Sequence, residues 1–325
     1  MMKKIALIYM GGTFGCVGQP LSPMPAAQFL PQLQNILEPA LDIDCLIAPV
    51  IKDSSACTPR DWLELVAYIQ TLQLQGYQHF VLIHGTDTLS YAAAVLARFL
   101  AQSVNMVVTG SQYPLLTAQG SALREHSDAL DNLNLALSQV KQLEAGVYVA
   151  FDQHIFHAQS VLKQHSTALN AFAGLHAHMD FKQTHQPYHI TARDLACADA
   201  FRCLNIMWQP LSMTQQVIQL KQLCQDAPDV LILQGFGIGN LHADDSLIEV
   251  LHDLYQAGCL TLLTSQVPFG GLDQRYAVSA WTTHAKILIS DCASHADLYA
   301  KALKIYLQYA TLDERRAHWH EFTSI

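Results

Sequence analysis

The chain is poor in charged residues and lacks a basic segment. Of its 325 residues only 14% are charged, against roughly 25% in typical soluble proteins, while 51% are hydrophobic. This balance indicates large buried cores and further surface buried between subunits. The formal net charge is −9, without any block of Lys or Arg. The sequence therefore argues against a nucleic-acid partner, because contacts with phosphate need clustered basic residues.

Signals for membranes, disulfides and metals are missing as well. No apolar run approaches the roughly 20 residues that span a bilayer, and the apolar start at residues 5–10 is too short for a signal peptide. The eight cysteines are dispersed, with no C-x-x-C pair. We therefore expect free thiols in a reducing cytoplasm, no membrane association, no metal and no cofactor. The histidine pairs 176/178 and 318/320 have no third ligand and are interpreted as surface histidines.

Short apolar runs alternate with helical patterns along the whole chain. Strands are expected at 3–10, 45–51, 79–83, 105–108 and 146–151, and later at 230–234, 260–267 and 286–290. Helices are expected between them, as at 26–38 and 89–100. This order predicts an α/β fold. A larger open, mostly parallel sheet with helices on both faces would occupy residues 1–187, and a linker at 188–203 would lead to a smaller α/β domain at 204–325.

Four of the expected strands end in turns that carry hydroxyl groups. The turns hold Thr13 after Gly12, Ser54 with Ser55, Thr86 with Asp87, and Ser111 with Gln112. Because parallel strands share their carboxyl edge, these side chains would converge in one cleft. Two alternatives remain open: Thr86 or Asp87 caps the following helix, and residues 52–55 form an ordinary polar loop. Residues 16–25 are expected to form a mobile lid over Thr13.

The residue types at these turns suit nucleophilic chemistry without a metal. A threonine hydroxyl is a weak nucleophile that needs a base or a strong hydrogen-bond network. A lysine whose pKa is lowered by burial can be that base, with Asp87 to orient it. The glycine-rich turns miss the G-x-G-x-x-G pattern of dinucleotide sites, and no G-x-S-x-G elbow is present. His84 is interpreted as a hydrogen-bonded histidine at a strand end.

Two motifs in this chain resemble the signatures of the bacterial-type L-asparaginases. YMGGTFG near the start is similar to the first signature of that family, and HGTDTLSYAA to the second. The segments DSSACTPRDW, VVTGSQYPL, HSDALDNLNLAL, LKQHSTALNAFAG and LQGFGIGN follow in the order and spacing of the family. The resemblance covers nearly the whole chain and is strongest to the cytoplasmic, type I branch.

This resemblance implies an amidohydrolase that converts L-asparagine to L-aspartate and ammonia through a β-aspartyl enzyme. Thr13 matches the nucleophile, and Thr86, Asp87 and Lys163 match a second catalytic group. The substrate-binding residues implied are Gly12, Ser54, Ser55, Thr86, Asp87, Ser111, Asn240 and Asp297. The last two match groups that a partner subunit contributes, so a homodimer or homotetramer is expected. The only other partner expected is a small substrate, L-asparagine or also L-glutamine.

The chain departs from the pattern of the family at several places. No tyrosine lies between Tyr9 and Tyr68, whereas relatives carry one in the loop after the nucleophile, at a place that corresponds to Leu21. Asp297 stands where glutamate is usual. The stretch QSVLK, which ends at Lys163, stands where relatives have a segment with arginine and threonine, and the connection 116–126 is longer. These departures predict reduced or altered activity. The alternatives are an inactive amino-acid sensor and the amidotransferase subunit that serves a charged transfer RNA; the latter carries an extra N-terminal domain, whereas the first strand here is expected from Lys3.

Overall fold

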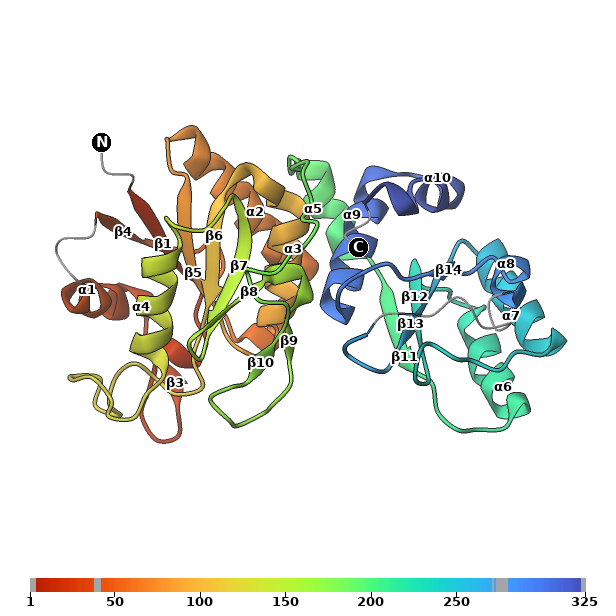
Figure 1. Ribbon diagram of the computed structural model, residues 1–325, viewed down its shortest axis with the longest axis horizontal. Helices are drawn as coiled ribbons and strands as arrows, with labels where there is room; N and C mark the ends of the chain where they lie inside the picture. The colour runs from red at the N-terminus through yellow and green to blue at the C-terminus, as the bar shows by residue number, and fades with distance from the viewer. Residues whose placement is uncertain (1–3, 38–41, 271, 273–279, 323–325) are drawn as a thin grey trace. The chain divides into compact units, whose positions relative to one another are not determined.

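The chain folds into two compact units. Figure 1 presents the computed structural model, which describes residues 4–37, 42–270, 272 and 280–322. Unit 1 comprises Met1–Asp199 and unit 2 comprises Ala200–Ile325. Helix α5 (Ala192–Ala200) lies within the segment that was expected to be a linker. Its first turn is held by the Asp194 carboxylate, which accepts hydrogen bonds from the amide and the hydroxyl of Thr191 at 2.8 and 2.7 Å. This part of the expected linker is therefore helical.

Unit 1 is built on a six-stranded sheet with the order β4-β1-β5-β6-β7-β8. The strands are β1 (Ile5–Tyr9), β4 (Ile43–Ile47), β5 (His79–Ile83), β6 (Asn105–Thr109), β7 (Gly146–Phe151) and β8 (His154–His157). All neighbouring strands run parallel except β7 and β8, which are antiparallel. The expected open, mostly parallel sheet is confirmed. The sequence analysis missed β8, because its four residues HIFH include two histidines and give no apolar run.

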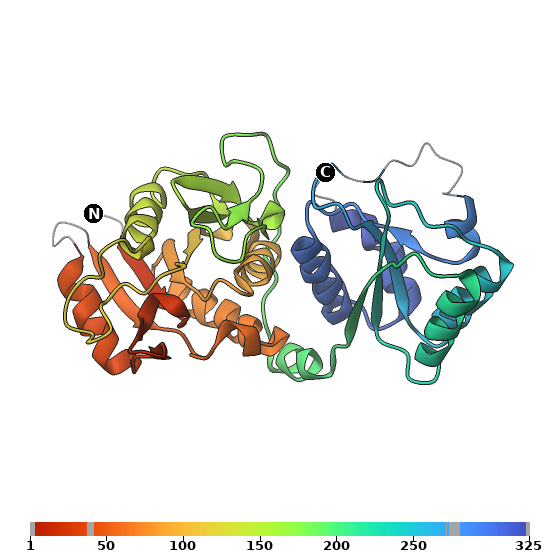
Figure 2. The same ribbon diagram turned by 90° about the horizontal axis from the view of Figure 1, so that it is seen from below.

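Helices cover both faces of this sheet (Figures 1 and 2). On one face, α1 (Ala26–Ile36) and α4 (Ala129–Gln139) pack against β1, β5 and β6 through a shared apolar cluster that includes Phe29, Leu133 and Ile83. On the other face lie α2 (Pro59–Leu74) and α3 (Leu89–Leu100). Because both faces are covered, β1 and β5 are buried at every residue, as their continuous apolar sequences predict.

The start of α2 shows how local sequence fixes these elements. The Thr58 hydroxyl accepts a hydrogen bond from the Asp61 amide, and the Asp61 carboxylate accepts one from the Thr58 amide, which completes a capping box. Pro59 occupies the first helical position, where its missing N–H costs nothing. This cap fixes the residue at which α2 begins, a few residues after the turn that follows β4.

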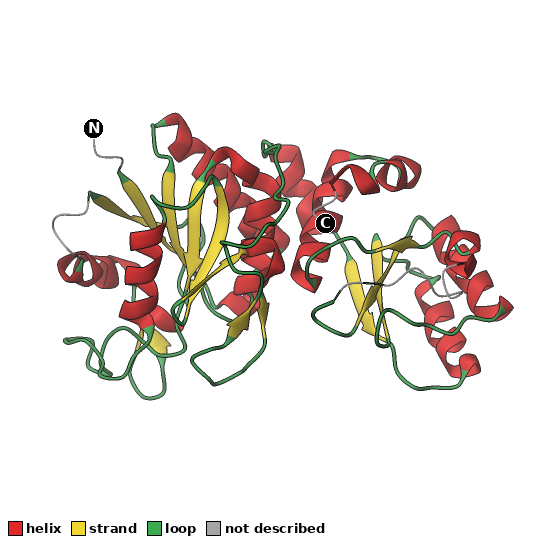
Figure 3. Ribbon diagram, in the orientation of Figure 1, coloured by secondary structure: helices red, strands yellow, loops and turns green. Residues whose placement is uncertain are grey.

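Several short elements lie along the carboxyl edge of unit 1 (Figure 3). They are η1 (Thr13–Gly15), β2 (Cys16–Val17), β3 (Ser22–Pro23), η2 (Ser54–Ala56), β9 (Leu162–Lys163) and β10 (Phe172–Ala173). Elsewhere in unit 1 the chain forms η3 (Ala101–Ser103) and η4 (Ala158–Ser160). The short strands pair as two antiparallel hairpins, β2 with β3 and β9 with β10. These elements position the residues expected at the functional site.

The segment expected to be a lid is tied to a second loop of unit 1. The amide of Leu115 donates to the carbonyl oxygen of Phe14 at 2.9 Å, and the amide of Gly18 donates to that of Ala118 at 2.9 Å. The second loop is itself a hairpin, in which Leu116 and Leu123 form an isolated antiparallel bridge. The long connection after β6 thus contacts the lid segment directly.

Unit 2 is a smaller parallel sheet with the order β11-β12-β13-β14. Its strands are β11 (Cys203–Met207), β12 (Val230–Gly235), β13 (Leu260–Ser265) and β14 (Leu288–Ile289). Its helices are α6 (Met213–Leu223), α7 (Asp245–Gln256), α8 (Ala280–His284), α9 (His295–Gln308) and α10 (Leu312–Ala317), followed by η6 (Trp319–Phe322). One apolar cluster joins α6 and α7 to β12 and β13, and includes Leu220, Val250 and Leu231. The expected smaller α/β unit is confirmed.

Most of the expected strands differ from the observed ones by a few residues at one or both ends, as two examples show. The strand expected at 45–51 is β4, which covers Ile43–Ile47 and ends before Pro49. The strand expected at 286–290 pairs only at Leu288–Ile289. Within the described residues, no helix combines the length and the apolar character needed to cross a bilayer.

Candidate active site

Four hydroxyl-bearing turns meet at one edge of the sheet in unit 1. They follow β4, β1, β5 and β6, which are consecutive and parallel in the sheet. The backbone joins them further, because the Met10 amide donates to Ile83 at 2.9 Å and the His84 amide donates to Thr109 at 2.9 Å. The strand ends thus bring the turns together as the sequence predicts.

Glycine packing places two of these turns in direct contact. A Cβ atom added to Gly12 would lie 2.4 Å from the Cα of Gly85, and one added to Gly85 would lie 2.4 Å from the hydroxyl oxygen of Ser54. Gly12 also has φ 88° and ψ −179°, a conformation that essentially only glycine adopts. Since Thr13 follows Gly12 and Thr86 follows Gly85, this contact fixes the two threonines on neighbouring turns.

Thr86, Asp87 and Lys163 form one hydrogen-bonded group. The Lys163 Nζ atom donates to the Thr86 hydroxyl oxygen at 2.9 Å and to the Asp87 Oδ1 atom at 3.2 Å. Lys163 comes from β9, which is 77 residues further along the chain than Thr86. The lysine side chain is 22% exposed and that of Asp87 is 62% exposed. An ion pair this exposed contributes little to stability. Its main structural effect is to hold the Lys163 amine next to the Thr86 hydroxyl.

The alternative in which Thr86 or Asp87 caps α3 is wrong. Thr88 is the residue before this helix, and no side chain caps the helix there. The Thr88 hydroxyl donates instead to the carbonyl oxygen of Ser54 at 2.7 Å. The side chains of Thr86 and Asp87 therefore do not cap the start of α3.

Thr13 is half-buried in η1. Among the described residues its hydroxyl has no hydrogen-bond partner, in contrast to the hydroxyl of Thr86. The residue corresponding to the missing tyrosine, Leu21, is 50% exposed. The turn thus presents a hydroxyl that is available to a ligand.

The two serines after β4 differ in their surroundings. Ser54 is buried against Gly85, while Ser55 is exposed and donates its hydroxyl to Asp53 at 2.7 Å. The Ser55 hydroxyl, together with the Ser55 amide, holds the pKa of Asp53 below its usual range. Residues 53–55 therefore form an ordered turn that faces the glycine contact.

Of the three remaining predicted binding residues, Ser111 and Asp297 are buried and Asn240 is exposed. Ser111 is buried, and its hydroxyl donates to the carbonyl oxygen of Tyr113 at 2.6 Å. Asn240 and Asp297 belong to unit 2, where Asn240 is exposed at the end of a glycine turn. Asp297 is fully buried in the first turn of α9, and its carboxylate accepts a hydrogen bond from the Ala293 amide at 3.3 Å. Their roles in binding a substrate remain predictions.

Asp128 is the residue before α4, yet its side chain does not cap this helix. The amide of Ala129 donates to the Ser127 hydroxyl oxygen at 3.1 Å. The Asp128 carboxylate instead accepts hydrogen bonds from the amides of Gln112 and Tyr113, at 2.9 and 3.0 Å. The helix thus holds the turn after β6, a role that the spacing of these residues did not reveal.

Only one of the two ring nitrogen atoms of His84 has a hydrogen-bond partner among the described residues, which corrects the expectation of a fully hydrogen-bonded histidine. Its Nδ1 atom lies 2.8 Å from the carbonyl oxygen of Gly85, and since that oxygen can only accept, Nδ1 carries the hydrogen. The Nε2 atom is buried and has no hydrogen-bond partner among the described residues. Burial lowers the pKa of His84 to about 4. The imidazole is therefore neutral at pH 7.

We expect His84 to make the folded state less stable in acid. The pKa of His84 is about 4 when folded and about 6.5 when unfolded, so the unfolded chain binds the extra proton first as the pH falls. The free energy of unfolding should drop by about 3 kcal/mol between pH 7 and pH 4 from this residue alone. The free energy of unfolding of His84→Gln, measured with urea over this pH range, should fall by correspondingly less than that of the wild type. His154→Gln, at an exposed histidine, is the control; equal slopes for His84→Gln and the wild type would contradict the prediction.

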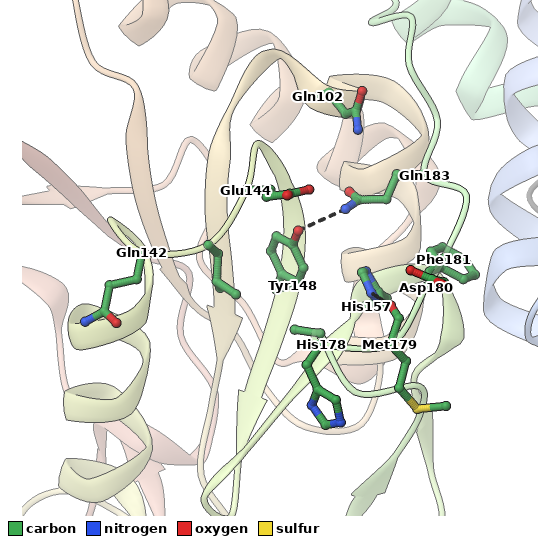
Figure 4. Close-up of a pocket in the computed structure, with 12 residues that line it drawn as sticks. Gln102, Gln142, Glu144, Tyr148, His157, His178, Met179, Asp180, Phe181 and Gln183 are labelled. Carbon is green, nitrogen blue, oxygen red and sulfur yellow. Dashed lines mark hydrogen bonds between the residues drawn. The ribbon is translucent and has the colours of Figure 1, made fainter.

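A separate cavity of about 390 Å³ lies at the opposite end of the sheet (Figure 4). Its walls include Tyr148 near the start of β7, Glu144, His157 and Gln183. The Gln183 amide donates to the Tyr148 hydroxyl oxygen at 2.9 Å, which closes one side. None of the residues expected to act on a substrate lines it, so this cavity is distinct from the site at the carboxyl edge.

No group of three His, Cys, Asp or Glu side chains within the described ranges is arranged to hold a metal ion. The rings of His176 and His178 stack at 5.5 Å between centroids. The Nδ1 atom of His318 lies 2.8 Å from Glu321.

Comparison with known proteins decides the family. The family model described as asparaginase, N-terminal, matches residues 4–187 of this chain, which is more than half of it. The chain belongs to the asparaginase family. This asparaginase-family chain is 27% identical to the L-asparaginase of Thermococcus kodakarensis over 246 residues, which cover 73% of the chain and 71% of that relative. It is 24% identical to L-asparaginase 1 of Escherichia coli K12 over 330 residues, 96% of the chain and 93% of the relative.

The fold of this family member is shared over its full length with a solved relative. The crystal structure of L-asparaginase I from Vibrio cholerae aligns with a TM-score of 0.79 at 20% identity, covering 100% of both chains. A subunit of the glutamyl-tRNA(Gln) amidotransferase from Haloquadratum walsbyi is also similar, with 25% identity over 332 residues, which cover 95% of this chain and 71% of that relative. Two named activities thus occur among the relatives of this asparaginase-family chain.

Proposed function

We propose that this protein is an amidohydrolase that converts L-asparagine to L-aspartate and ammonia, with Thr13 as its nucleophile. The observation that carries the proposal is the hydrogen-bonded group of Thr86, Asp87 and Lys163, held beside Thr13 by the contact between Gly12 and Gly85. A hydroxyl nucleophile needs such a proton-handling group nearby. Membership of the asparaginase family gives the reaction class.

In the proposed reaction the Thr13 oxygen forms a bond to the side-chain amide carbon of asparagine. The hydroxyl proton passes to the leaving nitrogen through Thr86 and Lys163, the C–N bond breaks, and ammonia departs. The β-aspartyl ester on Thr13 is then hydrolysed: water adds to the ester carbon, the bond to Thr13 breaks, and Thr13 recovers its proton. Asparagine and water are thus converted to aspartate and ammonia, and no other reactant is required.

The charges at this edge match those of an amino-acid substrate. The Asp87 carboxylate, which is well exposed, would bind the α-ammonium group, and charge-assisted hydrogen bonds of this kind are among the strongest available. The turn that holds Ser54 and Ser55 would bind the α-carboxylate, and the backbone at Gly12 would line the site. The same proposal gives Asn240 and Asp297 to the site of a second copy, in a homodimer or homotetramer. A monomeric mass in solution at micromolar concentration would contradict that assembly.

Ammonia release from the purified protein tests the function. We expect release from L-asparagine, weaker release from L-glutamine, and turnover below that of E. coli L-asparaginase 1 assayed in parallel, because no tyrosine lies between Tyr9 and Tyr68. Absence of release from both amides would refute the hydrolase. Faster release from glutamine than from asparagine would favour the role named for the glutamyl-tRNA(Gln) amidotransferase.

A second candidate, an amino-acid sensor that uses the same site, is favoured by one observation. The Thr13 hydroxyl has no hydrogen-bond partner among the described residues, so nothing there is seen to activate it. Calorimetry separates the two functions: a sensor gives a saturable heat of asparagine binding, while a hydrolase gives continuous heat from turnover.

A further inference from the structure

The Gln112 side chain bridges Thr86 and the loop that carries Lys163. Gln112 follows β6 and lies between two elements far apart in sequence. Its Nε2 atom donates to the carbonyl oxygens of Ala168 and Ser166, at 3.0 and 3.3 Å. Its Oε1 atom lies 3.5 Å from the Thr86 hydroxyl oxygen. One amide therefore contacts both Thr86 and the loop that follows Lys163.

The orientation of this amide follows from its neighbours. Backbone carbonyl oxygens accept hydrogen bonds and never donate them. Two such oxygens, of Ser166 and Ala168, face one end of the Gln112 amide, so that end must be the NH₂ group. The carbonyl oxygen of the amide is thereby turned toward Thr86.

This orientation sets the direction of the Thr86 hydroxyl. The Lys163 Nζ atom donates a hydrogen bond to the Thr86 oxygen at 2.9 Å, so this oxygen is the acceptor of the pair. The single hydroxyl hydrogen of Thr86 is then directed to the Oε1 atom of Gln112. The second lone pair of the Thr86 oxygen is left to accept a hydrogen bond from a nucleophile or from water.

The backbone of Gln112 is itself held from α4. The Asp128 carboxylate accepts a hydrogen bond from the backbone amide of Gln112 at 2.9 Å and another from the Asn132 side chain at 3.1 Å. The Asn132 Nδ2 atom donates to Gly110 at 3.1 Å as well. Asp128 and Asn132 are 8% and 2% exposed, so this support is shielded from competing water.

We propose that Gln112 is a positioning residue, which orients the Thr86 hydroxyl as a hydrogen-bond acceptor and anchors the loop that follows Lys163. The orienting role rests on the proposed function of Thr86, whereas the anchoring of the loop does not. Since Gln112 acts through Thr86 and Lys163, its loss should lower kcat more than it changes KM.

The test compares Gln112→Met with a matched variant, Gln164→Met. Gln164 is exposed and donates to Asn170 at 3.3 Å, so it bridges the same loop without a contact to Thr86. For Gln112→Met we expect kcat for asparagine to fall about tenfold, with KM within about twofold. Hydrogen exchange at the amides of residues 165–168 should rise in both variants, while Gln164→Met should keep kcat within about twofold.

Three results would overturn the inference. The first is a Gln112→Met protein whose kcat stays within twofold of the wild type. The second is an equal loss of kcat in Gln164→Met, which would show that loop order alone explains the effect. The third is unchanged hydrogen exchange at residues 165–168 in Gln112→Met. This last measurement needs no turnover, so it decides the anchoring role even if the wild type releases no ammonia and the proposed function fails.

Discussion

Thr13→Ala should reduce ammonia release from asparagine by at least about a thousandfold, because it removes the proposed nucleophile. Thr13 is half-buried and its hydroxyl has no partner among the described residues, so the fold should tolerate the change. Steady-state ammonia release and the midpoint of thermal unfolding, measured on the same sample, separate the two effects.

Two variants control the Thr13 experiment. Thr13→Ser keeps a hydroxyl and should retain measurable turnover. Ser22→Ala removes an exposed hydroxyl from the same segment and should behave as the wild type. Full activity in Thr13→Ala would show that the nucleophile is another group, and Thr86→Val would then be the next variant to measure.

Gly12→Ala should have the largest effect on stability. The new Cβ would lie 2.4 Å from the Cα of Gly85, a backbone atom that cannot rotate away. Overpacking costs about 1–3 kcal/mol, and the φ and ψ angles of Gly12 add a comparable penalty for any other residue. We expect the free energy of unfolding, measured by urea denaturation at pH 7, to fall by about 3–5 kcal/mol. Because the added Cβ forces the turns of Thr13 and Thr86 apart, turnover should be abolished as well.

Gly76→Ala is the matched control for this effect. Gly76 has φ +96°, close to the value at Gly12, but an added Cβ would meet nothing within 4 Å. Its substitution should cost only the backbone penalty, about 1–2 kcal/mol. If Gly12→Ala were no more destabilising than Gly76→Ala, the close contact between the two turns would not be needed for stability.

The parts of the site that were foreseen are those encoded over short distances in the chain. Each apolar run ends in a turn with a hydroxyl group, and the parallel order of the strands then requires the turns to meet. The same reasoning found the bounds of β5. Lys163 could be assigned only through the resemblance to a family, since its contact with Thr86 spans 77 residues and no local pattern signals it.

Other features were missed because tertiary contacts decide them. Asp128 has the spacing of a helix cap, yet its carboxylate binds two backbone amides of another turn. Gln112 has no helical or strand periodicity to mark it, and its role is visible only from the three oxygen atoms around its amide. The antiparallel strand β8 lacks the apolar run by which the other strands were recognised. Side chains that bind backbone at a distance leave little trace in local sequence.

The backbone contacts between the lid segment and the hairpin after β6 give the protein a means of adjusting its chemistry at a distance. The Leu115 amide is bonded to Phe14, the residue next to Thr13. Insertions or deletions between residues 116 and 123 would therefore shift the reactive turn without altering any group that touches a substrate. During divergence within the family, a change of length in this outer loop is therefore expected to move Thr13 while the side chains proposed to act on a substrate stay the same.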